Sequence, residues 1–127
     1  MLRKINPSDF LKPASNYSQA IAHKASAERL VISGQVGVRP DGSTVAGLEG
    51  QLEQTWVNFL AVLNSAGFAP TDVTKVTIFC TRPALMEFRK SRETALGAHA
   101  PAATYVQVAG LASPDYLVEI EGEAVKE

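Results

Sequence analysis

Six segments of the chain show either the alternation of apolar and polar positions or the run of β-branched residues that is typical of β-strands. The last segment is the most regular, because glutamates at every second position face away from valine, isoleucine and alanine. The expected strands cover residues 2–5, 17–22, 29–38, 73–81, 101–108 and 117–125. The second and third are predicted to form a β-hairpin. One face of the third strand is expected to hold Leu30, Ile32, Val36 and Val38, and the opposite face Ser33 and Gln35.

In two other segments the hydrophobic period lengthens to that of an amphipathic helix. Residues 46–66 carry one broad apolar stripe, and Gly67 suits the position just past a helix end. Residues 83–96 carry a weaker stripe, with Pro83 suited to the first helical turn and Gly97 to the end. The first stripe consists of Leu48, Leu52, Trp56, Phe59, Leu60 and Leu63.

This order of elements predicts an α+β fold, in which two helices pack on one face of a mixed β-sheet. The other face of the sheet then has no covering element. Because that face mixes polar and apolar side chains, it is either solvated or lines the interior of an oligomer, and the sequence leaves both readings open. Its expected members are Ser33, Gln35, Thr77, Phe79, Tyr105, Gln107, Glu119 and Glu121.

The composition predicts a single globular domain over residues 1–127. Hydrophobic residues make up 46% of the chain and charged residues 20%, which excludes a disordered protein. Twelve basic and thirteen acidic residues give a formal net charge of -1, so neither nucleic acid nor a membrane surface is an expected partner. A single cysteine, no signal sequence and no apolar run of membrane-spanning length lead us to expect a cytoplasmic protein.

Few residue patterns in the chain indicate a cofactor or an activated nucleophile. The sequence has no phosphate-binding glycine loop, dinucleotide fingerprint or metal-ligand cluster, so we expect neither a cofactor nor a metal. His23 and His99 are isolated and are predicted to lie in surface loops. Cys80 falls in an apolar strand and is predicted to be a buried, unreactive side chain.

Three segments together resemble the Rid (YjgF) family, whose members are small trimeric proteins and whose best-known members hydrolyse reactive imines. The segments are Val31–Val36, Pro101–Val108 and Val118–Glu121, in this order and at this separation. The resemblance implies a fold of the YjgF and chorismate-mutase type. It also implies a homotrimer with a barrel-like centre, in which small-molecule ligands bind in clefts between subunits.

The same resemblance assigns roles to three residues, each of which has a plainer alternative. Tyr17 matches a tyrosine near the family's ligand, but a half-polar aromatic residue can equally seal a loop or an interface. Ser33 matches a serine beside the cleft, and next to a glycine it can equally serve close strand packing. Glu119 matches a glutamate that positions the hydrolytic water, and the alternative is a solvated carboxylate on a polar strand face.

One position departs from the deaminating members of the family. They carry an arginine that holds the substrate carboxylate where this chain has Ala103. The backbone of Thr104 could still bind a ligand oxygen, and Tyr105 could fill the space of the missing side chain, so a neutral or aromatic ligand is expected. A basic residue of the second helix could instead supply the charge. Lys90 is the first candidate, with Arg89 and Arg92 beside it, and the alternative is a solvated helix face.

The leading hypothesis is therefore a Rid-like small-molecule-binding protein that hydrolyses or deaminates an imine or enamine other than the usual 2-imino acids. The alternative is a ligand-binding or interaction trimer that has lost this chemistry, which the alanine at position 103 favours. Ribonuclease activity is disfavoured by the balanced charge. A chorismate-mutase-like activity would rest on likeness of fold alone.

Overall fold

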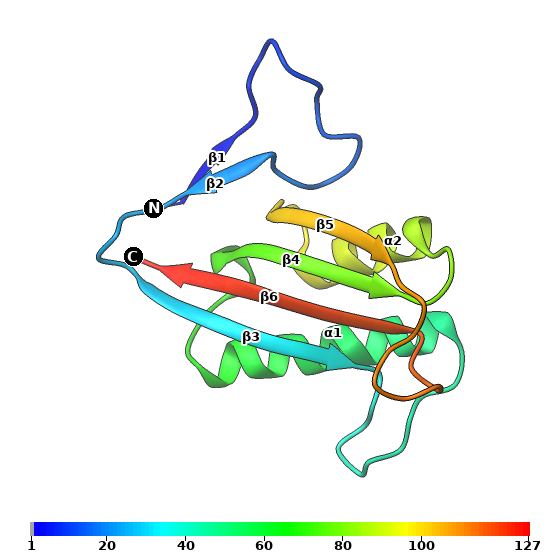
Figure 1. Cartoon of the computed structure of the whole chain (residues 1–127). Helices are drawn as coiled ribbons and strands as arrows, with labels where there is room; N and C mark the ends of the chain where they lie inside the picture. Colours follow the sequence, from blue (N-terminus) through cyan, green and yellow to red (C-terminus); the bar gives the residue numbers. More distant parts are fainter. Residues whose placement is uncertain (1) are drawn as a thin grey trace.

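A four-stranded mixed sheet with two helices on one face forms the body of the protein, of which the computed structural model describes residues 2–127 (Figure 1). The strand order is β3-β6-β4-β5, and all neighbours are antiparallel except β4 and β5. The α+β architecture predicted from the sequence is thus confirmed. The elements are β3 (Glu28–Val36), α1 (Leu48–Ser65), a 3-10 turn (Pro70–Asp72), β4 (Val73–Cys80), α2 (Leu85–Leu96), β5 (Ala102–Gln107) and β6 (Val118–Lys126).

The N-terminal strands form a separate small sheet. β1 (Arg3–Ile5) pairs antiparallel with β2 (Ala20–Ala22), and the first part of the loop between them projects away from the body (Figure 1). Near the end of this loop, Ser15 and Ser18 are hydrogen-bonded to Arg92 of α2 and to Pro101. The predicted hairpin between residues 17–22 and 29–38 is therefore wrong, because β3 pairs along its length with β6 instead. Alternation shows that a segment is a strand, whereas the partner is decided by which other strand offers a matching length and apolar face.

The core lies between the sheet and α1, which buries the stripe predicted for it. The Phe59 side chain is fully buried and meets Trp56 edge-to-face, with 5.3 Å between the ring centroids. The Phe59 ring also lies directly on the backbone of β6 at Gly122. A Cβ atom at Gly122 would come within 2.9 Å of the Phe59 ring and 2.6 Å of the Lys75 carbonyl oxygen. Glycine at this position allows the helix and the two strands to approach so closely.

A β-bulge interrupts β3 where sequence alternation predicted a regular strand. Ile32 pairs with Gly122 and Gln35 with Ile120, so two residues of β3, Ser33 and Gly34, lie opposite one residue of β6. The extra residue reverses the alternation beyond it. Gln35 thus shares the side of buried Ile120, and Val36 shares that of Glu119, which corrects the faces predicted for both.

The orientation of β5 corrects a second prediction, which placed Tyr105 and Gln107 on the uncovered face. The parallel register pairs Tyr105 with Ile78 and Gln107 with Cys80, two residues of the helix-covered face. The Tyr105 hydroxyl accepts a hydrogen bond of 2.8 Å from the backbone N–H of Ala84, just before α2. Cys80 is buried as predicted, and burial raises the pKa of its thiol.

His99 lies in the interior and not in the surface loop predicted for it. It is only 8% exposed, and its Nε2 lies 2.6 Å from the Val73 carbonyl oxygen, so Nε2–H donates a hydrogen bond there. Burial is the main cause that lowers the pKa of His99 below the ordinary value of 6.5. His23, in contrast, is exposed as predicted.

We expect the folded protein to lose stability as the pH falls below 6.5, the ordinary histidine pKa, because the unfolded chain then binds a proton that folded His99 resists. Thermal unfolding at pH 7.5 and 5.5 measures this loss. The difference in melting temperature should shrink in His99→Gln and persist in His23→Gln. An undiminished difference in His99→Gln would assign the pH dependence to other groups.

Candidate functional site

Glu119 lies on the uncovered face of the sheet, across the bulge of β3. Its neighbours on the two flanking strands are Val36 and Phe79, and its side chain is half-buried. A Cβ atom at Gly34 would overlap the Glu119 carboxylate and would lie 2.9 Å from its Cγ. Because glycine has no Cβ atom, the Glu119 carboxylate can pack directly on the backbone at Gly34. The bulge sets the position of this backbone and so of the carboxylate.

Two further predicted site residues share this uncovered face. Ser33 is exposed and lines a hollow of about 190 Å³ between β3, β6 and β4, together with Lys75 and Glu121. On β5, Thr104 lies opposite Thr77 of β4. The Thr104 hydroxyl accepts a hydrogen bond of 2.7 Å from the Lys75 ammonium group. Glu119, Ser33 and Thr104 thus form one group on one face, which we call the glutamate group.

The other predicted residues lie on the opposite face, at the β5 edge of the sheet. Ala103 and Tyr105 pack against the core on the side covered by α2. Tyr17 is half-buried in the loop before β2, which is held to β5 by a hydrogen bond of 3.0 Å from the Ser18 N–H to the Pro101 carbonyl oxygen. Tyr17, Ala103 and Tyr105 form a second group, the tyrosine group. Within one chain, the sheet itself separates the two groups.

Comparison with known proteins identifies the family. Residues 8–126 match the family model described as Endoribonuclease L-PSP. The chain belongs to the Rid (YjgF) family. A RutC family protein of Pyrococcus horikoshii is 36% identical over 121 residues, which cover 91% of each chain. Its counterpart in Pyrococcus abyssi is 34% identical over 121 residues, again with 91% of each chain covered.

Solved structures of Rid proteins share the fold over their whole length. The Rid-family protein YyfB of Yersinia pestis, described as of unknown function, superposes with a TM-score of 0.88 at 30% identity, with 98% of both chains covered. RidA of an Antarctic Psychrobacter species superposes with a TM-score of 0.74 at 28% identity, covering 98% of this chain and 99% of that one.

In this Rid-family chain, the basic residue that joins the tyrosine group is Arg92. It is 2% exposed, its guanidinium carbon lies 5.1 Å from the centre of the Phe88 ring, and its Nη2 donates a 3.1 Å hydrogen bond to the Ser15 hydroxyl. Burial is the main cause that lowers the pKa of Arg92. The signal that could have found it is its spacing, because Phe88, Arg92 and Leu96 are four residues apart on one helix face.

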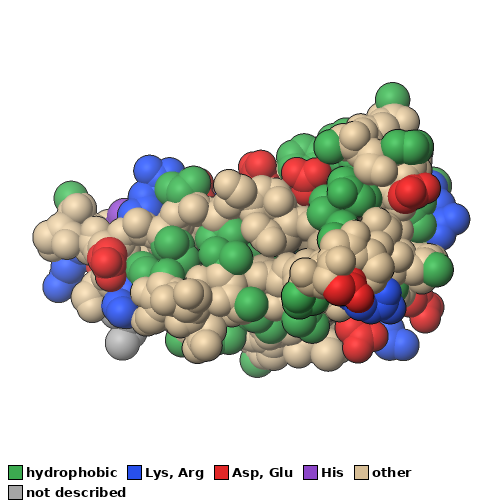
Figure 2. All heavy atoms as spheres, turned by 90° about the horizontal axis from the view of Figure 1, so that it is seen from below, with side chains coloured by type: hydrophobic (Ala, Val, Ile, Leu, Met, Phe, Trp, Pro, Cys, Tyr) green, Lys and Arg blue, Asp and Glu red, His purple; other side chains and the backbone are tan. Residues whose placement is uncertain are grey.

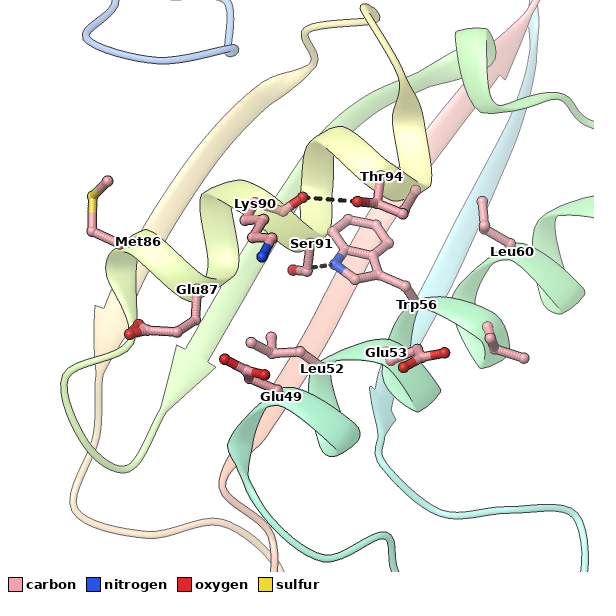
Figure 3. A pocket seen from close by; sticks show the side chains of 12 residues that line it. Glu49, Leu52, Glu53, Trp56, Leu60, Met86, Glu87, Lys90, Ser91 and Thr94 are labelled. Atoms are coloured by element: carbon pink, nitrogen blue, oxygen red, sulfur yellow. Dashed lines mark hydrogen bonds between the residues drawn. The ribbon is translucent and has the colours of Figure 1, made fainter.

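Lys90, the first candidate for a replacement charge, lies on the other side of α2. Figure 3 shows it at a groove of about 800 Å³ between α1 and α2, where its ammonium group points toward Glu49. The floor includes Trp56, whose indole N–H donates a 3.0 Å hydrogen bond to the Ser91 hydroxyl. Successive helix residues are turned by about 100°, so Lys90 and Arg92 face nearly opposite directions. Lys90 therefore does not join Tyr17.

On the face shown in Figure 2, basic side chains lie mainly toward the two ends, with acidic side chains among them. No helix within residues 2–127 is long and apolar enough to cross a membrane. Over the same residues, no three His, Cys, Asp or Glu side chains are grouped so that they could hold a metal ion.

Proposed function

We propose that this Rid-family protein binds a small metabolite in a cleft between two copies of the chain and hydrolyses its C=N bond. The substrate class is an imine or enamine other than the usual 2-imino acids. The observation that carries this proposal is the separation of the two groups. Glu119 lies on the uncovered face of the sheet, whereas Ala103 and Tyr105 pack on the helix-covered face and Tyr17 lies in the loop near Arg92 of α2. A ligand can meet both only if the β5 edge of one copy packs against the uncovered face of another.

The uncovered face supports such an assembly. It carries exposed Val31, at 66% exposure, and half-buried Phe79 beside the charged residues of β6. Apolar side chains on a sheet face without a covering layer gain free energy when a second surface removes them from water. The arrangement we propose is the family's homotrimer, with three such sheets around a barrel-like centre.

The chemistry requires one proton acceptor and one water molecule. The Glu119 carboxylate takes a proton from water while the resulting hydroxide adds to the carbon of the C=N bond, and the nitrogen takes up a proton. The carbinolamine then collapses to a carbonyl compound and ammonia. The half-buried position of Glu119 over Gly34 holds the carboxylate in one place for this step. An enamine enters the same sequence after protonation on carbon.

A second candidate function is supported by Ala103. A methyl group cannot grip a carboxylate as a guanidinium does, so the family's known contact to its substrate is absent from β5. The chain would then be a trimer that binds a ligand or a partner without hydrolysing it. Both candidates use the same cleft and differ only in whether Glu119 acts on a water molecule.

An imine-trapping assay tests the proposal. Amine and amino-acid oxidases generate imines from benzylamine, leucine and phenylalanine, and semicarbazide competes for each imine as it forms. We expect the protein to lower the yield of semicarbazone for the imine of benzylamine and to change the yields for the 2-imino acids of leucine and phenylalanine much less. We also expect it to elute at the mass of three chains in size-exclusion chromatography with light scattering. A trimer that leaves every semicarbazone yield unchanged would favour the non-catalytic candidate.

A further inference from the structure

The helix layer carries a groove that the proposed reaction does not use. It lies between α1 and α2, has a volume of about 800 Å³, and is lined mainly by apolar side chains (Figure 3). Two of these side chains are open to water, since Val57 is 53% exposed and Met86 is 67% exposed. A ligand can therefore enter this groove from solvent without displacing any part of the fold.

Three carboxylates and one ammonium group also line the groove. Glu49 and Glu53 belong to α1, and Glu87 and Lys90 belong to α2 (Figure 3). None of the three carboxylates forms an ion pair with a lysine or arginine among residues 2–127. Three negative charges against one positive charge leave two negative charges unbalanced. The charge of the groove therefore favours a cationic ligand.

Helix stability explains only part of this negative charge. Glu49 and Glu87 lie in the first turns of their helices, where the helix dipole stabilises a carboxylate. Glu53 lies one turn further into α1, beyond the reach of that effect. It is four residues from Glu49, and like charges at this spacing destabilise a helix. A cation bound between Glu49 and Glu53 would remove this repulsion.

The same face of α1 becomes apolar one turn later. Val57 follows Glu53 at a spacing of four residues, and half-buried Leu60 comes next on that face. Figure 3 shows Leu60 toward one end of the groove and Glu49 toward the other. The groove thus has an acidic end and an apolar end.

We propose that this groove is a second binding site, which takes a small organic cation with an ammonium group on an aryl or alkyl body. The ammonium group lies between Glu49 and Glu53, and the body lies along Val57 and Leu60. This orientation follows from the two ends of the groove, because each end of the ligand then meets side chains of matching character.

The size of the groove favours a small molecule over a helix of a partner protein. Its volume lies within the range of about 300–1,000 Å³ that is usual for small-molecule sites. A docked helix presents apolar anchors over two or more turns. Val57 and Met86 are the only large apolar side chains of the groove that are exposed, which is too few to receive such a row of anchors.

The test compares three compounds that share one apolar body: phenylbutylammonium, phenylbutanol and phenylbutanoate. Trp56 is the only tryptophan of the chain and lies at the floor of the groove, so its fluorescence reports binding there. Calorimetric titration of the intact protein gives each affinity. We expect the cation to bind with a Kd of about 1 mM or below, which is usual for a ligand of this size. Phenylbutanoate should bind at least about tenfold more weakly, with phenylbutanol between the two.

Variants of opposite charge effect sharpen the test. Glu53→Gln should weaken binding of the cation by about two- to fivefold, the usual effect of one exposed charge. Lys90→Met should strengthen it by a similar factor, because a competing ammonium group is removed. Phenylbutanol should bind both variants as it binds the wild type. The matched control is Glu93→Gln, since Glu93 is an exposed carboxylate of α2 that does not line the groove.

The stability of the ligand-free protein gives a second readout. Glu53→Gln should unfold at the wild-type temperature or above it, because the repulsion from Glu49 is lost. A less stable Glu53→Gln would show that Glu53 has a structural role in α1, and this result would contradict the inference.

Three further results would overturn it: equal affinity for the three compounds, binding of the cation without a change in Trp56 fluorescence, or weaker binding by Lys90→Met. Equal affinity would mean that the groove is plain apolar surface, open to a protein partner. The inference does not rest on the proposed function, because the groove and Glu119 lie on opposite faces of the sheet. Glu119→Gln should therefore bind the cation as the wild type does, whatever happens to imine hydrolysis.

Discussion

Glu119→Gln is expected to slow imine hydrolysis by roughly 10²- to 10⁴-fold, the usual contribution of a positioned general base. The amide has the shape of the carboxylate and still forms hydrogen bonds, but it cannot take a proton from water. The semicarbazide assay measures the change as a return of the semicarbazone yield to its uncatalysed level. Glu121→Gln is the matched control, because Glu121 lies two residues away on the same strand face and is exposed.

Gly34→Ala moves the carboxylate without removing it. The added methyl group would occupy the space of the Glu119 carboxylate, which is the far end of a flexible side chain and can swing away. We expect activity to fall by up to about 10²-fold, as misplacement by about 1 Å can cause, while thermal stability changes little. Activity that survives both Glu119→Gln and Gly34→Ala would show that another group positions the water.

Gly122→Ala is expected to destabilise the fold by about 3 kcal/mol, at the upper end of the usual cost of overpacking. The new methyl group would meet the Lys75 carbonyl oxygen at 2.6 Å and the Phe59 ring at 2.9 Å, and neither can move without shifting β4 or α1. For a chain of this length, the melting temperature should fall by roughly 10 °C.

Two other glycines provide the comparison. A Cβ atom at Gly110 meets nothing within 4 Å, so Gly110→Ala should unfold near the wild-type temperature. Gly34→Ala should lie close to it, since the atoms it displaces belong to the Glu119 side chain and not to the backbone. A melting temperature of Gly122→Ala equal to that of Gly110→Ala would show that the contact between Phe59 and β6 is looser than described here.

The hydrophobic pattern determined the elements of this protein and the fold class. The segment with the apolar stripe of Trp56 and Phe59 forms α1, and the alternating segment around Ile120 forms β6. The ends of both elements lie within a few residues of the predicted bounds. These predictions hold because the period of side chains along a helix or strand is a local property of the backbone. Three short motifs in order were sufficient to indicate the Rid family.

Only the tertiary structure decided which strands pair and which way the site residues point. One extra residue at Ser33 and Gly34 reversed the faces of Gln35 and Val36, and the parallel register of β5 turned Tyr105 toward the helices. A bulge or a register depends on a partner strand far away in the sequence, which local periodicity does not contain.

Tertiary packing also distinguishes the two basic candidates of α2, Lys90 and Arg92. In the sequence, Lys90 and Arg92 are equivalent basic residues of a helix. The fold places Lys90 at the groove beside α1 and buries Arg92 against the loop that carries Ser15 and Tyr17. The sequence likewise predicts a surface position for His99, whereas the fold buries it with its Nε2 hydrogen-bonded to the Val73 carbonyl oxygen. Burial of a polar side chain is decided by what folds over it, so the sequence named the candidate residues and the tertiary structure chose among them.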